Sequence, residues 1–181
     1  MKPADEQAFY EIYNAYYQDV YRYVFHTVKQ RADVEDLVQE IFLQAYRSFM
    51  KFRGESGYRT WLFSIAHNHL NSMWRKLFRR KQIHEQYERD VRSELTEDDG
   101  EWKRMLLQQE LREALLQIPD HYRDVVVLRY LHDFHVGDAA VILGMTEAKV
   151  RMLTHRAILK LRDVWEREGG GELYGRANPI A

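Results

Sequence analysis

Cationic and aromatic side chains alternate between Lys51 and Lys81, and this mixture is suited to nucleic-acid binding. Five of the seven residues from 75 to 81 are Lys or Arg, a density of cations that holds phosphates electrostatically. Aromatic rings beside cations can stack on bases that have left a duplex, although such rings can equally belong to a core. Asn68 and Asn71 are available for hydrogen bonds to base edges. The rings concerned are Phe52, Tyr58, Trp61, Phe63 and Trp74.

A second basic segment follows Gly144. Residues 138–151 contain a short apolar stretch, a glycine, a capping Thr146 and the start of another amphipathic stretch, which is the order of a helix-turn-helix. An ordinary helical hairpin with a solvated basic face is the alternative, but five Lys and Arg against one acid between residues 146 and 162 favour DNA. Val150, Leu153 or Thr154, Ala157 and Leu161 are expected to face inward. The outward or flanking side chains are then Lys149, Arg151, His155 and Arg156.

The stretch from Asp33 to Phe49 has two contrasting faces. Apolar residues recur at i, i+3, i+4 and i+7 from Val34 onward, which predicts an amphipathic helix with Asp33 as its N-cap. The apolar positions are Val34, Leu37, Val38, Ile41, Phe42, Ala45, Tyr46 and Phe49. The opposite face carries Asp36, Gln39, Glu40 and Leu43. This face is either a solvated acidic surface or a docking surface for a basic partner, and the stretch alone does not decide between them.

The eight histidines do not form a recognisable metal site. His67 and His69 are two residues apart, so on a helix they diverge by about 200° and cannot share a metal ion. The absence of cysteine excludes disulfides, thiol chemistry and cysteine-based zinc sites. The chain also lacks a zincin motif, a glycine-rich phosphate loop and a nucleophile elbow. We therefore expect no enzyme active site, no metal and no cofactor.

Helical periodicity extends along most of the chain, and prolines occur only at positions 3, 119 and 179. The sequence predicts an all-α fold of two small helical domains joined by a flexible acidic linker. Residues 1–81 contain 13 Lys and Arg against 9 Asp and Glu, whereas residues 82–119 contain 5 against 10. The expected divisions are a first domain over 1–81, a linker over 82–104, a second domain over 105–168 and a disordered tail over 169–181. The expected helices cover residues 9–28, 33–49, 58–81, 102–118, 120–132, 136–143 and 146–168.

The amino-acid sequence also bears on location. No apolar run approaches the roughly 20 residues that a membrane-spanning helix needs. The first residues, MKPADEQAFYEIY, are acidic and amphipathic, unlike a signal peptide. We expect a soluble cytoplasmic protein with no membrane insertion.

With both basic segments and the acidic helix in view, the chain resembles the ECF (extracytoplasmic function) sigma factors of bacterial RNA polymerase. The resemblance covers about residues 9–81 and 105–165, and the order and spacing of its segments agree with the family. The segments are DVEDLVQEIFLQAYRSF, FRGESGYRTWLFSIAHNHLNSMWRK and LLQIPDHYRDVVVLRY…AAVILGMTEAKVRMLTHRAILKLR. The resemblance implies a sigma region 2-like helical bundle in residues 1–81 and a region 4-like helix-turn-helix domain in residues 105–168.

The resemblance also implies a role for each surface. In the family, the helix similar to residues 33–49 docks on a coiled coil of the polymerase β′ subunit, so the residues expected to bind core polymerase are Asp36, Gln39, Glu40 and Leu43. The segment similar to residues 52–81 recognises and opens the −10 promoter element, with Trp61 and Asn68 at positions associated with strand separation and base capture. The residues expected there are Arg53, Arg59, Trp61, Asn68, Asn71, Arg75 and Lys76. The helix-turn-helix resembles the −35 module, and its expected DNA contacts are Lys149, Arg151, Met152, His155 and Arg156.

The implied partners are core RNA polymerase, through the β′ coiled coil and the β flap, and promoter DNA. Family members are commonly held inactive by a membrane-linked anti-sigma factor, so retention at the membrane by such a partner is a further expectation. Two departures from the family make its promoter preference unsafe to transfer. Asp138, Ala139 and Ala140 replace the usual Glu-Ile-Ala, and Met152 and Leu153 stand where small polar and basic residues are common.

The function we expect is that of an ECF-type sigma factor, which binds core RNA polymerase and directs promoter-specific transcription initiation without catalysis of its own. The alternative is a stand-alone helix-turn-helix transcriptional regulator, which the acidic docking face and the separate basic block disfavour. A helical enzyme or metal protein is a third hypothesis, and the lack of a ligand cluster argues against it.

Overall fold

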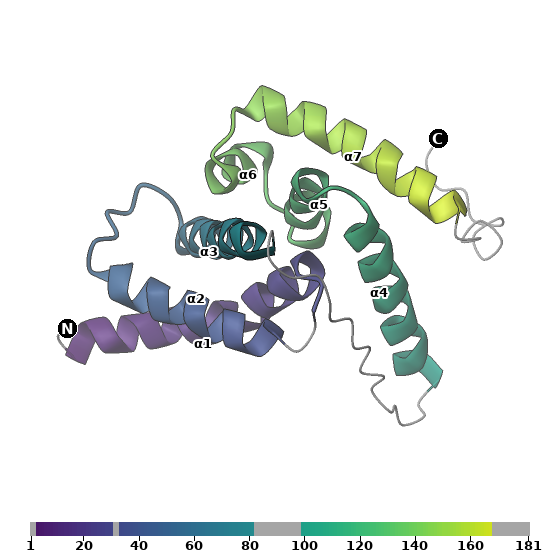
Figure 1. Ribbon diagram of the computed structural model, residues 1–181. Coiled ribbons are helices and arrows are strands. Elements are labelled where there is room, and N and C mark those ends of the chain that lie inside the picture. The colour runs from purple at the N-terminus through teal and green to yellow at the C-terminus, as the bar shows by residue number, and fades with distance from the viewer. Residues whose placement is uncertain (1–2, 31–32, 82–98, 168–181) are drawn as a thin grey trace.

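The computed structural model describes residues 3–30, 33–81 and 99–167, with side chains placed in 5–30, 33–75 and 107–167. Every regular element within these ranges is a helix, which confirms the all-α prediction (Figure 1). The helices are α1 (Pro3–Thr27), α2 (Val34–Phe49), α3 (Tyr58–Lys81), α4 (Asp99–Gln117), α5 (Asp120–Val126), the π-helix η2 (Val127–Leu131), α6 (Val136–Leu143) and α7 (Glu147–Arg167). Residues 99–104, which we assigned to the linker, are helical. The rest of that linker, residues 82–98, and the expected tail lie outside the described residues.

Helices α1, α2 and α3 form the N-terminal module. The apolar stripe predicted for α2 is buried from Val34 to Ala45, because it packs on the aromatic face of α1. Phe42 contacts Tyr13 edge to face, with ring centroids 4.8 Å apart. Tyr46 departs from the prediction. Its ring meets that of Phe9 in a T-shaped contact with centroids 5.2 Å apart, and 38% of Tyr46 remains exposed.

The C-terminal module consists of α4, α5, η2, α6 and α7. Pro119 interrupts the helix between α4 and α5, since its ring cannot continue a helical ladder. The β-branched run from Val125 to Leu128 is helical and buried, crossing from α5 into η2. Gly144 has a φ of 61°, the left-handed conformation that glycine adopts without steric cost, and it turns the chain from α6 into α7.

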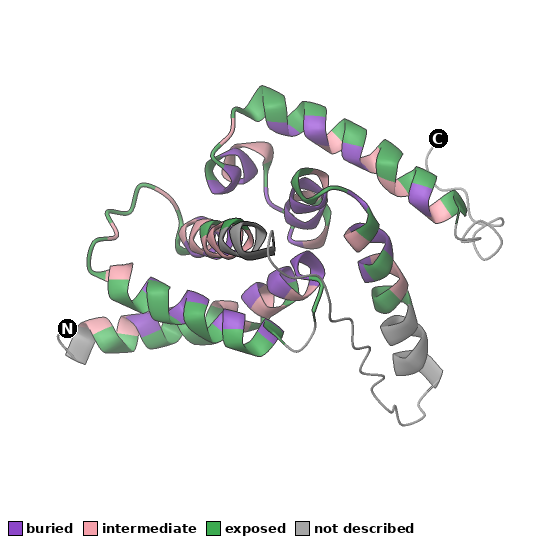
Figure 2. Ribbon diagram, viewed as in Figure 1, coloured by how far each residue is buried: buried purple, intermediate pink, exposed green. Residues whose placement is uncertain are grey.

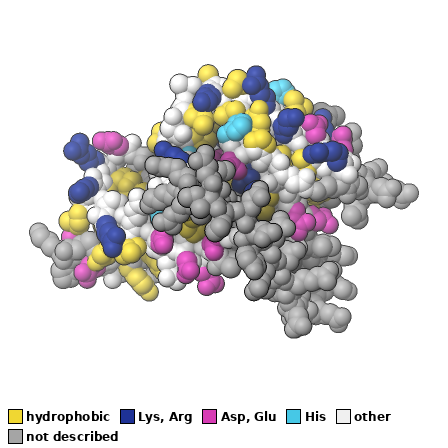
Figure 3. Space-filling model, in the orientation of Figure 1, with side chains coloured by type: hydrophobic (Ala, Val, Ile, Leu, Met, Phe, Trp, Pro, Cys, Tyr) yellow, Lys and Arg dark blue, Asp and Glu magenta, His cyan; other side chains and the backbone are white. Residues whose placement is uncertain are grey.

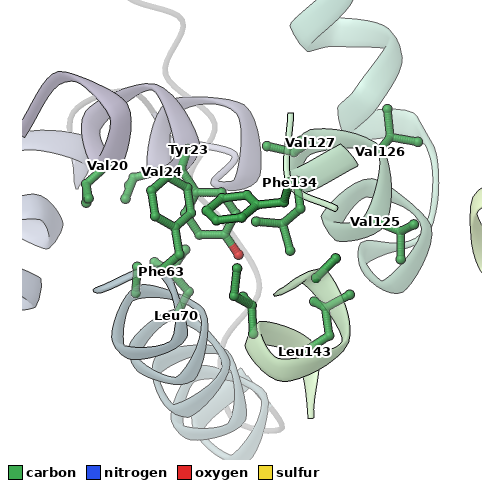
Figure 4. Close-up of a cluster of buried hydrophobic side chains, with 14 of the residues drawn as sticks. Val20, Tyr23, Val24, Phe63, Leu70, Val125, Val126, Val127, Phe134 and Leu143 are labelled. Atoms are coloured by element: carbon green, nitrogen blue, oxygen red, sulfur yellow. The ribbon is translucent and has the colours of Figure 1, made fainter. Parts of the chain in front are cut away.

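The two modules share one hydrophobic core. Helix α3 lies between α1 and α2 on one side and α6 on the other, and α1 also contacts α4, α5 and η2 (Figures 1 and 2). Phe63 of α3 is fully buried, with its ring 5.2 Å from Tyr23 of α1 and 4.8 Å from Phe134 of the C-terminal module (Figure 4). We expected separate modules on a flexible linker and did not predict this packing.

Candidate functional site

The outer face of α2 is exposed as predicted. Asp36, Gln39 and Glu40 are exposed, and Leu43 is 49% exposed, although large aliphatic side chains are usually buried. Glu40 also reaches α3, where its Oε2 lies 3.0 Å from Nε2 of His69. The other ring nitrogen of His69 lies 3.1 Å from Oε1 of Gln44. The acidic face is therefore attached to α3 at one edge and open to solvent over the rest.

Apolar side chains extend this face beyond Leu43 toward the end of α2, and the sequence analysis missed the exposure of Tyr46 and Met50. Leu43, Tyr46 and Met50 are spaced three and four residues apart and all are exposed. Tyr46 then borders a shallow apolar groove that it shares with Phe9, Tyr10, Tyr13 and Glu6 of α1. The signal that could have identified this surface was Met50, an apolar residue one turn beyond Tyr46.

The aromatic residues around the glycine loop divide between core and surface. Phe63 is fully buried, whereas Tyr58 is 43% exposed. Phe52 and Trp61 are half-buried, with ring centroids 5.0 Å apart, and Trp61 also contacts Phe49. Trp61 is thus held by neighbouring rings while part of its surface reaches solvent. The core interpretation is therefore confirmed for Phe63, whereas base stacking by the partly exposed rings stays a prediction.

The expected −10 residues do not form one uniform surface. Arg53, Asn68 and Arg75 are exposed, whereas Arg59, Trp61 and Asn71 are half-buried. The side chain of Lys76 lies outside the described residues. The exposed residues can reach a DNA backbone or base as they stand, and the half-buried ones are held by protein contacts.

Arg59 points into the C-terminal module. Its Nη2 donates a 2.6 Å hydrogen bond to the carbonyl oxygen of His132, and its guanidinium lies 4.2 Å from the ring centre of Phe134. Nε of Arg59 also lies 3.7 Å from the carboxylate of Asp19. Sequence reasoning assigned Arg59 to DNA, but in this structure it joins the two modules.

Asn71 is connected to a buried polar group. Its Nδ2 lies 2.8 Å from Nε2 of His67, whose Nδ1 lies 3.3 Å from the hydroxyl of Tyr23 and 3.7 Å from Oδ2 of Asp124. Burial lowers the pKa of His67 to about 4 and raises the pKa of the Asp124 carboxyl to about 7. Between these values both groups are neutral, so His67 Nε2 can accept the hydrogen bond of the Asn71 amide.

The two faces of α7 match the sequence prediction, with Leu161 half-buried rather than fully buried. Val150, Leu153 and Ala157 are buried and Thr154 is half-buried, while Lys149, Arg151, Met152, His155 and Arg156 are all exposed. Thr146 Oγ1 accepts a 3.3 Å hydrogen bond from the backbone of Lys149, which confirms the predicted cap. Nη2 of Arg151 lies 2.6 Å from Oε2 of Glu147, one turn earlier. Lys, Arg and His side chains gather along this edge of the molecule (Figure 3).

Within the residues that the structure describes, no group of three His, Asp or Glu side chains is placed to hold a metal ion. Within the same ranges, no helix combines the length and the apolar character that crossing a membrane requires.

Comparison with known proteins identifies both modules. Residues 12–80 match the family model "Sigma-70 region 2", and residues 108–161 match "Sigma-70, region 4". In solved structures, the chain is similar to the sigma factor RpoE of Bartonella quintana, crystallised with the anti-sigma factor NepR. The TM-score is 0.72 at 21% identity, covering 88% of this chain and 98% of that one, a likeness that establishes the fold alone.

Two relatives from Bacillus subtilis (strain 168) are more similar in sequence. RNA polymerase sigma factor YlaC is 32% identical over 154 residues, which cover 84% of this chain and 88% of the relative. ECF RNA polymerase sigma factor SigX is 32% identical over 165 residues, covering 87% of this chain and 83% of the relative. The chain belongs to the ECF family of RNA polymerase sigma factors.

Proposed function

We propose that this sigma factor uses three separate surfaces to direct promoter-specific transcription initiation by core RNA polymerase. The observation that carries the proposal is the exposed outer face of α2, a helix separate from α3 and α7, which carry the basic residues (Figure 1). A stand-alone regulator needs only the recognition helix α7. A docking face and a second DNA-binding helix are required when the chain must also attach to polymerase and open DNA.

The outer face of α2 binds core polymerase in this proposal. Asp36, Gln39 and Glu40 supply polar and acidic groups, and Leu43 supplies an apolar contact beside them. Interface energy concentrates in a few residues of this kind, with polar neighbours that exclude water. A partner surface that presents basic and apolar side chains would be complementary to this face, and the partner we propose is the β′ coiled coil.

The exposed side of α3 binds the −10 element. Arg53 and Arg75 hold phosphates, while Asn68 offers amide hydrogen bonds to the edge of an unstacked base. Trp61 packs against Phe52 and is only half-buried, so part of its aromatic face remains exposed near the same side of the helix. Removing a base from the stack costs a few kcal/mol, which such contacts must offset.

Helix α7 reads the −35 element in the major groove. Arg151 and Arg156 provide forked donors that fit the O6 and N7 acceptors of guanine, and Met152 provides an apolar contact for a thymine methyl group. Lys149 and His155 complete the surface as phosphate or base contacts. The ion pair with Glu147 holds the Arg151 guanidinium close to the helix until DNA replaces it.

The working unit is a region 2 module over 1–81, a linker over 82–104, a region 4 module over 105–168 and a tail over 169–181. Catalysis belongs to the polymerase, with no cofactor held by this chain. The β flap is proposed as the core contact of the C-terminal module. We also propose cytoplasmic action and control by an anti-sigma factor, which in a membrane-linked form would keep the chain at the membrane.

Core-dependent transcription tests this function. The purified chain and bacterial core polymerase are incubated with a library of random promoter fragments, and the transcripts are sequenced. We expect defined start sites only when both proteins are present, preceded by shared −10 and −35 sequences. A chain that binds DNA specifically yet yields no transcripts with core would favour the stand-alone regulator.

A further inference from the structure

The side-chain amide of Asn71 is held by a buried histidine. Asn71 lies on α3 three residues after the exposed Asn68 and is itself half-buried. Its Nδ2 lies 2.8 Å from Nε2 of His67, a residue that is only 8% exposed. Among the described residues, Oδ1 of Asn71 has no hydrogen-bond partner, and it is not one of the buried polar atoms that lack one, so this oxygen reaches solvent. The inner edge of the amide is therefore fixed and its outer edge is open.

The surroundings of His67 determine which way the amide is turned. Nδ1 of His67 faces two oxygens, the Tyr23 hydroxyl at 3.3 Å and Oδ2 of Asp124 at 3.7 Å. Burial keeps the imidazole neutral at neutral pH, because it lowers the pKa of His67 to about 4. A neutral ring carries one N–H, and its place on Nδ1, toward the two oxygens, leaves Nε2 as the acceptor. Asn71 then donates to His67 through Nδ2, and its Oδ1 faces outward.

The outward edge of this amide has a fixed order of acceptor and donor. His67 uses one N–H of Asn71, so the edge offers the Oδ1 acceptor beside the second N–H. Adenine and cytosine, when unstacked, present an amino donor beside a ring-nitrogen acceptor on the Watson–Crick edge, which matches the amide. Guanine and thymine present an oxo acceptor beside an N–H donor. They would require the amide turned over, with loss of the hydrogen bond to His67.

Arg75 places a cation beside this edge. It is exposed, lies one turn after Asn71, and its Nε donates a 3.2 Å hydrogen bond to the backbone carbonyl of Asn71. Asn68, Asn71 and Arg75 are spaced three and four residues apart, so they lie along one stripe of α3. A base bound to the amide can therefore have its phosphate close to the guanidinium, in a charge-assisted contact.

We propose that Asn71 selects an amino base, adenine or cytosine, at one position of the unstacked −10 strand, and that His67 is the positioning residue that keeps the amide from turning over. Contact with a −10 strand rests on the proposed function, whereas the orientation of the amide does not. A bidentate pair between an amide and a base discriminates by about 5- to 150-fold against the wrong base. His67 contributes to this discrimination without touching DNA.

The orientation of the amide can be measured without DNA. In the isotopically labelled full chain, nuclear magnetic resonance correlations between ring nitrogens and ring protons show which nitrogen of each histidine carries the proton. The His67 ring is assigned through its own backbone amide. We expect His67 to carry its proton on Nδ1 at neutral pH. A proton on Nε2 would turn the Asn71 amide around and overturn the proposal.

Base preference tests the selection itself. Holoenzyme assembled from core polymerase and the full chain is bound to forked promoter DNA whose unpaired −10 strand carries each of the four bases, or hypoxanthine, at one position in turn. At one position we expect adenine and cytosine to bind about 5- to 150-fold more tightly than guanine and thymine, and hypoxanthine to behave like guanine. Asn71→Ala should lower the affinity for adenine and cytosine to that for guanine and thymine. Asn14→Ala, the same change at an exposed position of α1, is the control and should keep the preference.

His67→Phe separates positioning from contact. Phe fills the buried site without a ring nitrogen, so the Asn71 amide is free to turn over. In the variant shown by circular dichroism to be folded, the affinity for guanine and thymine should rise toward that for adenine and cytosine. If this variant does not fold, the wild-type tautomer and the Asn71→Ala profile decide instead. A full amino-base preference in folded His67→Phe or in Asn71→Ala would overturn the proposal. If the wild-type holoenzyme shows no base preference anywhere in the −10 strand, the proposed role of α3 fails and base selection fails with it, while the tautomer still reports the orientation of the amide.

Discussion

The two helices proposed to bind DNA differ in what surrounds them. Helix α7 lies along the outer edge of the molecule, and its five candidate DNA contacts are all exposed (Figure 2). Helix α3 packs against the C-terminal module, and its candidates Arg59 and Asn71 are half-buried. The proposed −35 surface is thus accessible to DNA, whereas the proposed −10 surface is only partly accessible. The presence of a basic segment does not show that its Lys and Arg side chains are free to bind DNA. Neighbouring helices can already hold these side chains in hydrogen bonds and ion pairs.

Removing the Phe63 ring, which joins the two modules, should have the largest effect on the free energy of unfolding. Phe63 is fully buried, and its ring centroid lies within 5.2 Å of those of Tyr23, His132 and Phe134. Truncating a buried Phe typically lowers the free energy of unfolding by about 3–5 kcal/mol, so Phe63→Ala should do so in urea titrations. Leu159→Ala, on the exposed side of α7, should change it by less than about 0.5 kcal/mol. Similar losses for the two variants would mean that the shared core contributes little.

The exposed DNA-binding surface proposed on α7 should show a measurable base-sequence specificity. Arg151→Ala should weaken binding of the full chain to −35 duplex DNA by about 1–3 kcal/mol and relax the preference at one base pair. Fluorescence anisotropy with duplexes altered one base pair at a time measures both effects. Lys160→Ala removes another exposed cation of α7, outside the proposed base contacts, and should leave the sequence preference intact. Unchanged affinity of the Arg151 variant across every duplex would remove it from the proposed contacts.

The buried ionisable groups around the module junction should make stability depend on pH. Burial lowers the pKa of His26, His67 and His132 to about 4 from the usual 6.5, so the unfolded chain binds more protons between these values. The free energy of unfolding should therefore rise with pH from about 4 to 6.5. Asp124 opposes this trend, because burial raises its pKa to about 7, but three histidines outweigh one carboxyl.

Urea titrations across this pH range measure the slope. His132→Gln should reduce it, since that ring no longer titrates, while His121→Gln, at an exposed position, should not. A slope that is the same in wild type and the His132 variant would show that burial of this ring does not govern the pH response.

Local signals in the sequence predicted the helices and two of the surfaces. The periodicity of residues 34–45 identified a buried stripe and, opposite it, the exposed Asp36, Gln39, Glu40 and Leu43. Gly144 and Thr146 identified the turn and the start of α7, because left-handed backbone and N-caps have strong residue preferences. These features depend on neighbours only a few residues away.

The contacts between modules could not be predicted in this way. Arg112 and Arg123 bond to carbonyls more than 80 residues earlier, and no local pattern specifies a partner so distant. The sequence does not distinguish an arginine that caps a helix from an arginine that binds phosphate. The one available signal was the position of Arg112, three residues before the buried Leu115 on the same helical stripe.

The central claim, that the outer face of α2 makes this chain a subunit of polymerase, is tested most directly by a pull-down with core enzyme. Asp36→Arg combined with Leu43→Ala changes two exposed positions seven residues apart on one face and leaves the buried stripe intact. We expect the folded double variant, checked by circular dichroism, to lose core binding while keeping its affinity for −35 DNA. Glu11→Arg with Leu159→Ala makes matched changes at exposed positions elsewhere and should bind core normally. Normal core binding and transcription by the folded Asp36, Leu43 variant would contradict the account.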